Sequence, residues 1–164
     1  ILNNACFEYL RQQVLSGVNA LQIFDSWADL LSENELERYS LQYTQQLAYL
    51  LKSDPITSNI PIILFEKAPK KKIDDLVFEN ISCVSLYWQE NIESVAKNFK
   101  NQYAIQGNLD PKVLLGSDEL IWNETQKICS IMSEYPGFIF NLGHGITPDI
   151  NPSKVKVMID AIRQ

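Results

Sequence analysis

Apolar and polar residues follow a pattern along the chain that predicts helices and strands in regular succession. Short continuous apolar runs are typical of buried strands, and apolar residues at three- and four-residue spacing are typical of helices. Strands are predicted at residues 20–24, 60–65, 81–86, 103–106 and 137–140. Helices are predicted at 4–16, 33–50, 73–78 and 91–99, and again after Ser117 and from Pro152. Because the strands are apolar throughout, the pattern favours an α/β fold with a parallel sheet covered on both faces.

Three of these helices have a recognisable start and a predicted buried face. Ser32 and Glu35 form a capping-box pattern at the start of the second helix. The residues expected to share its buried face are Leu36, Tyr39, Tyr43, Leu47 and Leu50. The helix after Ser117 is expected to bury Ile121, Thr125, Ile128 and Met132, and the last helix Val155, Met158, Ile159 and Ile162.

Composition narrows the function classes. The 164 residues have 46% hydrophobic and 21% charged content, which is typical of one globular domain, and the net charge of −6 argues against a general nucleic-acid surface. The basic run of Lys67 and residues 70–72 is followed by Asp74 and Asp75, which favours a solvated loop over a phosphate site. No apolar run approaches the ~20 residues of a membrane span, and the first residues lack the features of a signal peptide.

The sequence lacks the cysteine, histidine and glycine motifs that are typical of metal sites and nucleotide-binding sites. Cys6, Cys83 and Cys129 are far apart and odd in number, as expected for reduced thiols of a cytosolic protein. With a single histidine and no His-x-Cys or Cys-x-x-Cys spacing, no metal site is expected. No glycine-rich phosphate motif follows a strand, so no nucleotide cofactor is expected either.

Candidate chemistry gathers where three predicted strands end. Residues 25–27 follow one strand, residues 106–110 follow another, and residues 141–144 end in His144, the only histidine of the chain. Gly143 and Gly145 flank His144 and are expected to free the backbone on both sides of it. In a (β/α) barrel these strand ends meet on the face that carries the active site. The alternative is a histidine packed in a turn without a catalytic role.

These segments, in this order, resemble the uroporphyrinogen decarboxylase family. The matching stretches are residues 22–28, 106–111 and 139–146, followed by Asn151 and Pro152 before the last helix. The resemblance implies a cofactor-free, cytosolic and homodimeric (β/α)8 TIM barrel. It also implies removal of the four acetate carboxyl groups of uroporphyrinogen III, a tetrapyrrole, to give coproporphyrinogen III in haem biosynthesis.

The resemblance also assigns residues. Ser26 matches the serine that hydrogen-bonds a substrate carboxylate. His144 matches the active-site histidine, as a catalytic and substrate-binding group, and whether it transfers a proton or only binds carboxylate stays open. Asn108 and Asp110 are expected to shape the site through caps and turns. Asp25 either orients Ser26 or, as we prefer, pairs with a backbone N–H, and Trp27 is expected to be packed.

The sequence departs from the family in several places. Asp29 stands where the family usually has glycine, and Tyr87 stands where it usually has aspartate. The family's Arg-Gln-Ala-Gly-Arg motif, catalytic aspartate and substrate-binding tyrosine have no counterpart here. We therefore expect residues 1–164 to be the C-terminal portion of a single barrel domain, some five βα units without the N-terminal half. Alone, such a portion is expected to be inactive, because five strands cannot close the barrel.

Two other functions stay open. One is a related zinc- and corrinoid-dependent methyltransferase, which the missing His-x-Cys pair disfavours. The other is a non-catalytic half-barrel that serves as a binding or assembly module.

Overall fold

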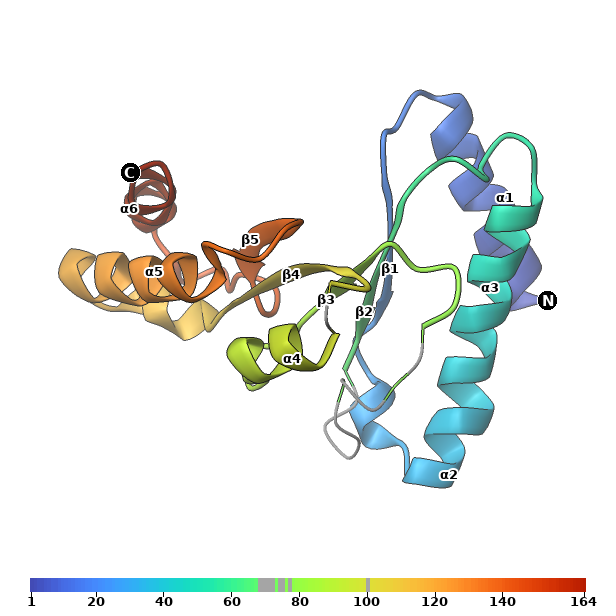
Figure 1. Cartoon of the computed structure of the whole chain (residues 1–164), viewed down its shortest axis with the longest axis horizontal. Helices are drawn as coiled ribbons and strands as arrows, with labels where there is room; N and C mark the ends of the chain where they lie inside the picture. Colours follow the sequence, from blue (N-terminus) through green and yellow to red (C-terminus); the bar gives the residue numbers. More distant parts are fainter. Residues whose placement is uncertain (68–72, 74–75, 77, 100) are drawn as a thin grey trace. The chain divides into compact units, whose positions relative to one another are not determined.

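The computed structural model describes residues 1–67, 73, 76, 78–99 and 101–164 (Figure 1). The strands are β1 (Leu21–Asp25), β2 (Ile62–Glu66), β3 (Cys83–Ser85), β4 (Ala104–Leu109) and β5 (Phe138–Leu142). The helices are α1 (Leu2–Leu15), α2 (Glu33–Leu36), α3 (Gln42–Ser53), α4 (Ile92–Phe99), α5 (Asp118–Met132) and α6 (Pro152–Ile162). Three further turns are η1 (Ala28–Leu30), η2 (Glu37–Leu41) and η4 (Pro111–Leu115).

Hydrogen bonding orders the strands as they occur in the chain, from β1 to β5. The alternation of helices with parallel strands confirms the predicted α/β class. The chain divides into two compact units, residues 1–84 and 85–164, which are described separately below.

In the first unit, β1 and β2 pair in parallel with Asp25 opposite Glu66. Alternate residues of a strand face opposite sides. Leu21 and Ile23 therefore share one face, which packs on α1 and α3 (Figure 1). The buried residues of this core are Leu10, Leu21, Leu47, Ala48, Leu51 and Ile62. The opposite face carries Phe24, whose ring contacts Phe65 at a centroid distance of 6.0 Å.

The predicted buried face of the second helix is wrong in its middle part. Ser32 caps α2 with the predicted capping box, but a π-helical turn, η2, then interrupts the helix before α3. The extra residue of a π turn rotates the face that points to the sheet. Ser40 and Leu41 are buried as a result, whereas Tyr39 and Tyr43 are exposed.

In the second unit, β4 and β5 pair in parallel, with Asn108 opposite Asn141. Helices α5 and α6 pack together beside these strands. The buried residues of this core are Leu109, Leu114, Ile121, Ile150 and Met158. The predicted face of α5 is confirmed, because Ile121, Thr125 and Met132 are buried and Ile128 packs on the core.

Several predicted details need correction. Helix α6 buries Met158 and Ala161 and packs Val155 against the core as predicted, but it leaves Ile159 and Ile162 exposed. Strand β4 continues to Leu109 and so includes residues predicted to be loop. The sheet is also not covered evenly, since Phe24 is 64% exposed.

Part of the sequence prediction lies outside the described residues. This applies to Lys70, Lys71, Lys72, Asp74 and Asp75, and to half of the helix predicted at 73–78. The described members of that segment, Ile73, Leu76 and Phe78, are buried. Across the described part of the chain, every helix is too short or too polar to cross a bilayer.

Candidate functional site

The first unit carries a buried polar cluster where β1 and β2 end. Asp25 and Glu66 are opposite each other in the register, on the strand face that points to the helices. The π turn places Ser40 between them, with its Oγ 2.5 Å from Asp25 Oδ2 and 2.7 Å from Glu66 Oε1. Burial raises the pKa of Glu66 to about 7, and the nearby Asp25 charge also raises it, whereas the hydrogen bond between Glu66 and Ser40 lowers it.

Sequence reasoning assigned Asp25 but missed Ser40 and Glu66. A signal for Glu66 was present, because it ends an apolar run in the same way as Asp25 ends the run before it. Ser40 had no such signal, because its position depends on the π turn. Among the described residues, no backbone N–H donates to the Asp25 carboxylate, which contacts the Ser40 hydroxyl instead. The backbone carbonyl oxygen of Asp25 accepts the Lys67 N–H at 3.1 Å.

Ser26 and Trp27 follow β1 directly. Ser26 is half-buried, and its hydroxyl has no hydrogen-bond partner among the residues that the structure describes. Trp27 is 74% exposed, so the expectation that it is packed is wrong. Two residues further, Asp29 forms an ion pair with Lys67 at 2.9 Å, which gives the unusual Asp29 a structural partner.

His144 lies in the second unit, in the turn after β5. The residue is exposed, and its ring forms a T-shaped contact with the Tyr87 ring at a centroid distance of 5.9 Å and an interplanar angle of 78°. Tyr87 also contacts the Trp88 ring at 5.4 Å. The aromatic side chain at position 87, where the family usually has aspartate, thus forms one wall beside the imidazole.

Gly143 holds this turn in place by close packing and not by backbone freedom. Its N–H donates to the Leu109 carbonyl at 2.8 Å, and its carbonyl accepts the Trp88 N–H at 3.2 Å. A Cβ at this position would lie 2.3 Å from the Trp88 nitrogen, so only glycine fits. Gly145 has open space around it, and neither glycine has a positive φ. The expectation that Gly143 frees the backbone is therefore wrong, and the same expectation for Gly145 stays a prediction.

Asn108 and Asp110 act on the backbone around the strand end. The Asn108 amide is buried and donates to the carbonyls of Tyr87 at 3.0 Å and Glu90 at 2.8 Å. Asp110 caps η4 by accepting the Lys112 N–H at 2.9 Å. These contacts tie the β4 end to the segment that carries Tyr87 and so fix the surroundings of His144.

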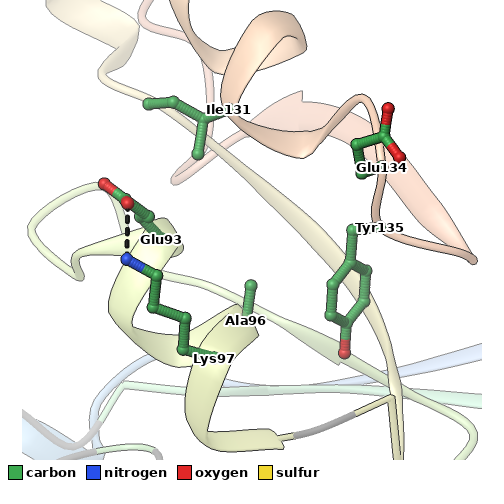
Figure 2. Close-up of a pocket in the computed structure, with 6 residues that line it drawn as sticks. All are labelled: Glu93, Ala96, Lys97, Ile131, Glu134 and Tyr135. Carbon is green, nitrogen blue, oxygen red and sulfur yellow. Dashed lines mark hydrogen bonds and ion pairs between the residues drawn. The ribbon is translucent and has the colours of Figure 1, made fainter.

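Elsewhere in the second unit, a surface pocket of about 250 Å³ lies between α4, α5 and the turn after α5 (Figure 2). Glu93 and Lys97 line it and form an ion pair at 2.6 Å, and Tyr135 faces them across the pocket. None of the candidate site residues that the sequence predicted lines this pocket. It lies on the helices, whereas the candidate residues lie at the strand ends.

The candidate residues are divided between the units, with Asp25 and Ser26 in the first and Asn108, Asp110 and His144 in the second. Within the described residues, no group of three His, Cys, Asp or Glu side chains is arranged to hold a metal ion.

Comparisons with known proteins place the chain in a family. The sequence model described as "Uroporphyrinogen decarboxylase (URO-D)" matches residues 1–164. A uroporphyrinogen decarboxylase of Vesicomyosocius okutanii is 37% identical over 161 residues, covering 98% of this chain and 46% of the relative. That of Chloroherpeton thalassium is 38% identical over 160 residues, covering 96% and 45%. The chain thus spans about half the length of these curated relatives.

A solved structure adds information on the fold. A methyltransferase from Methanosarcina mazei superposes with a TM-score of 0.79 at 18% identity, covering 98% of this chain and 46% of that chain. At this identity the likeness shows the fold alone. Together with the family match, it confirms the expectation of about half of a TIM barrel. The family match over the whole length, with the two relatives, shows that this chain belongs to the uroporphyrinogen decarboxylase family.

Proposed function

We propose that the chain contributes part of the active site of a uroporphyrinogen decarboxylase, a carboxy-lyase that converts uroporphyrinogen III to coproporphyrinogen III. The family match over residues 1–164 is the observation that carries this proposal. Residues 1–164 are proposed to form the C-terminal portion of one barrel domain, and this portion alone is proposed to be inactive. The whole enzyme is proposed to be a cytoplasmic homodimer that needs no cofactor.

The chemistry sets what the site must supply. Each step converts a CH2–COO⁻ group on a pyrrole to CH3, with loss of CO2 and uptake of one proton. Protonation of the pyrrole carbon next to the ring nitrogen creates a cationic acceptor for the electron pair of the breaking C–C bond. A second proton then adds to the exocyclic carbon and completes the methyl group, and the first proton leaves the ring carbon to restore the aromatic pyrrole, so that one proton is taken up in total. The site must therefore supply an acid and donors that orient the substrate carboxylates.

Two residues are proposed to meet these needs. The Ser26 hydroxyl, which has no partner among the described residues, donates to a substrate carboxylate. His144, exposed in its turn, binds a carboxylate or donates the proton. Asp25, Asn108 and Asp110 shape the strand ends around them through the contacts described above.

The test is turnover of uroporphyrinogen III by the intact protein, meaning the whole enzyme of which residues 1–164 are proposed to be the C-terminal portion. The coproporphyrinogen product is quantified chromatographically. His144→Ala is expected to lower kcat at least about 100-fold if the imidazole transfers a proton. Ser26→Ala is expected to raise KM by roughly 10-fold through the loss of one charge-assisted hydrogen bond. The exposed Glu8→Gln on α1 is the control and should leave both constants unchanged.

The same assay on residues 1–164 alone tests the inactivity. Turnover by this portion would overturn the proposal that it is inactive. Porphyrin binding by the intact protein without any turnover would overturn the enzymatic function and favour the binding module.

A further inference from the structure

The contacts of Ser40 constrain where protons lie at the ends of β1 and β2. Its hydroxyl oxygen is within hydrogen-bond distance of two carboxyl oxygens, 2.5 Å from Asp25 and 2.7 Å from Glu66. A hydroxyl carries a single proton, so it donates to one of them and must accept from the other. A carboxylate has no proton to donate. One of the two carboxyl groups is therefore the neutral acid.

Burial identifies the neutral group as Glu66. Glu66 is 2% exposed, whereas Asp25 is half-buried. Low-dielectric surroundings disfavour a charge most at the more buried of the two groups. Glu66 Oε2 is also buried, and it has no hydrogen-bond partner within the described part of the chain. A neutral carbonyl oxygen tolerates that position better than a charged carboxylate oxygen does.

The charged groups around the cluster also favour Glu66 as the neutral group. Lys67, the next residue in the chain, forms an ion pair with Asp29 on η1. Among the described residues, the group that faces Glu66 from β1 is the Asp25 carboxylate, which repels a second negative charge. From η2 the facing group is the uncharged Ser40.

We propose that Glu66 is a protonated positioning residue, which donates a hydrogen bond to Ser40 so that Ser40 donates to the Asp25 carboxylate. This relay fastens the ends of β1 and β2 to the π turn, and with them the turn that starts at Ser26. The protonation does not depend on the enzymatic function, but a consequence for substrate binding through Ser26 rests on the proposed function.

The relay is sensitive to pH in the neutral range. Burial places the pKa of Glu66 at about 7. Above this value the proton leaves to solvent, Ser40 then has two carboxylate acceptors for one proton, and one contact opens. The turn after β1 is expected to change position across this range.

The first test is infrared spectroscopy of the intact protein in D2O, which separates the C=O stretch of a protonated carboxyl from carboxylate bands. A protonated-carboxyl band is expected below neutral pH that disappears with a midpoint near 7. Glu66→Gln should remove the band, because the amide replaces the acid as donor to Ser40. Glu8→Gln on the exposed face of α1 is the matched control and should keep it.

Two outcomes would overturn the proposal. One is the lack of a protonated-carboxyl band above about pH 5, where ordinary carboxyl groups are ionised. The other is a band that persists in Glu66→Gln and disappears in Asp25→Asn, which would move the proton to Asp25. Because neither measurement uses substrate, failure of the proposed enzymatic function leaves this test intact.

The second test asks whether the relay positions the turn. With 5-fluorotryptophan incorporated, the ¹⁹F resonance of Trp27, assigned with Trp27→Phe, should shift with the same midpoint as the infrared band. Glu66→Gln should keep the resonance at its low-pH position throughout. The resonance of Trp122 on α5 is the internal control. A Trp27 resonance that stays fixed while Glu66 titrates would show that the relay does not position this turn.

Discussion

The strand ends of the two units are held by different chemistry. In the first unit, two carboxyl groups, Asp25 and Glu66, share one buried hydroxyl. In the second, the strand end is held by neutral groups, with Asn108 donating to two carbonyls and Gly143 bonded through its backbone. The first arrangement depends on where one proton lies, whereas the second has no titrating group in these bonds.

The difference separates two ways of presenting a ligand-binding residue. Ser26 follows a strand end that is held by hydrogen bonds that respond to pH. His144 lies in a turn that is held by close packing and by hydrogen bonds between neutral groups. The first unit should therefore lose order as the pH rises through neutrality, and the second should not. Each prediction below changes one of these fastenings.

The largest effect is expected at Gly143. In Gly143→Ala the new Cβ would lie 2.3 Å from the Trp88 nitrogen and 2.5 Å from its Cα, both of them backbone atoms. The backbone of the turn must move, which we expect to lower the free energy of unfolding by about 3 kcal/mol or more. Denaturant unfolding of the intact protein measures this loss.

Gly145→Ala is the matched control, because a Cβ at Gly145 meets no atom within 4 Å. Its effect on the free energy of unfolding should stay within about 0.5 kcal/mol. Equal losses in the two variants would show that the turn is not held by its contact with Trp88.

The second effect concerns the pH dependence of stability in the first unit. The pKa of Glu66 is raised from an ordinary 4.5 to about 7 in the folded protein. Between these values the folded state keeps a proton that the unfolded state has lost. This contribution to stability is complete below 4.5, falls as the pH rises, and is gone above 7, a total of about 3 kcal/mol.

Glu66→Gln removes this titration and should flatten the stability profile over that range, measured by denaturant unfolding at several pH values. Glu8→Gln should keep the slope of the unsubstituted protein. A slope that is unchanged in Glu66→Gln would assign the pH dependence to another group and contradict the relay.

These predictions use features that the sequence revealed to different degrees. The apolar runs predicted each strand to within a few residues, because a buried strand needs little beyond continuous apolar side chains. The capping box at Ser32 was also predictable, since it depends only on residues three apart. Such features are local in the chain.

The parts that could not be predicted depend on contacts between distant residues. The π turn rotates Ser40 toward Glu66, 26 positions away, and helical periodicity assumes that no such turn occurs. Gly143 is required by Trp88, which pattern analysis does not place beside it. His144 was singled out as the only histidine of the chain, directly after a predicted strand, whereas the role of Ser26 came from the family resemblance. The catalytic roles of both residues stay predictions.

The smallest effect is expected at Asn108 in the second unit. Asn108→Ala removes the amide that donates to the carbonyls of Tyr87 and Glu90, at a cost of about 1 kcal/mol for each bond. The free energy of unfolding should fall by about 2 kcal/mol. Asn141→Ala is the control, since Asn141 is exposed and, among the described residues, its side chain bonds only the adjacent Leu142 N–H.

The pH dependence of the loss of unfolding free energy in Asn108→Ala tests whether the two strand ends are held independently. An amide and two carbonyls do not titrate, so Asn108→Ala should cost the same on both sides of neutral pH. Glu66→Gln, by contrast, should differ from the unsubstituted protein by an amount that changes across the same range. If the cost of Asn108→Ala varied with pH in parallel with the Glu66 titration, the second unit would be coupled to the proton in the first. The two fastenings would then not be independent.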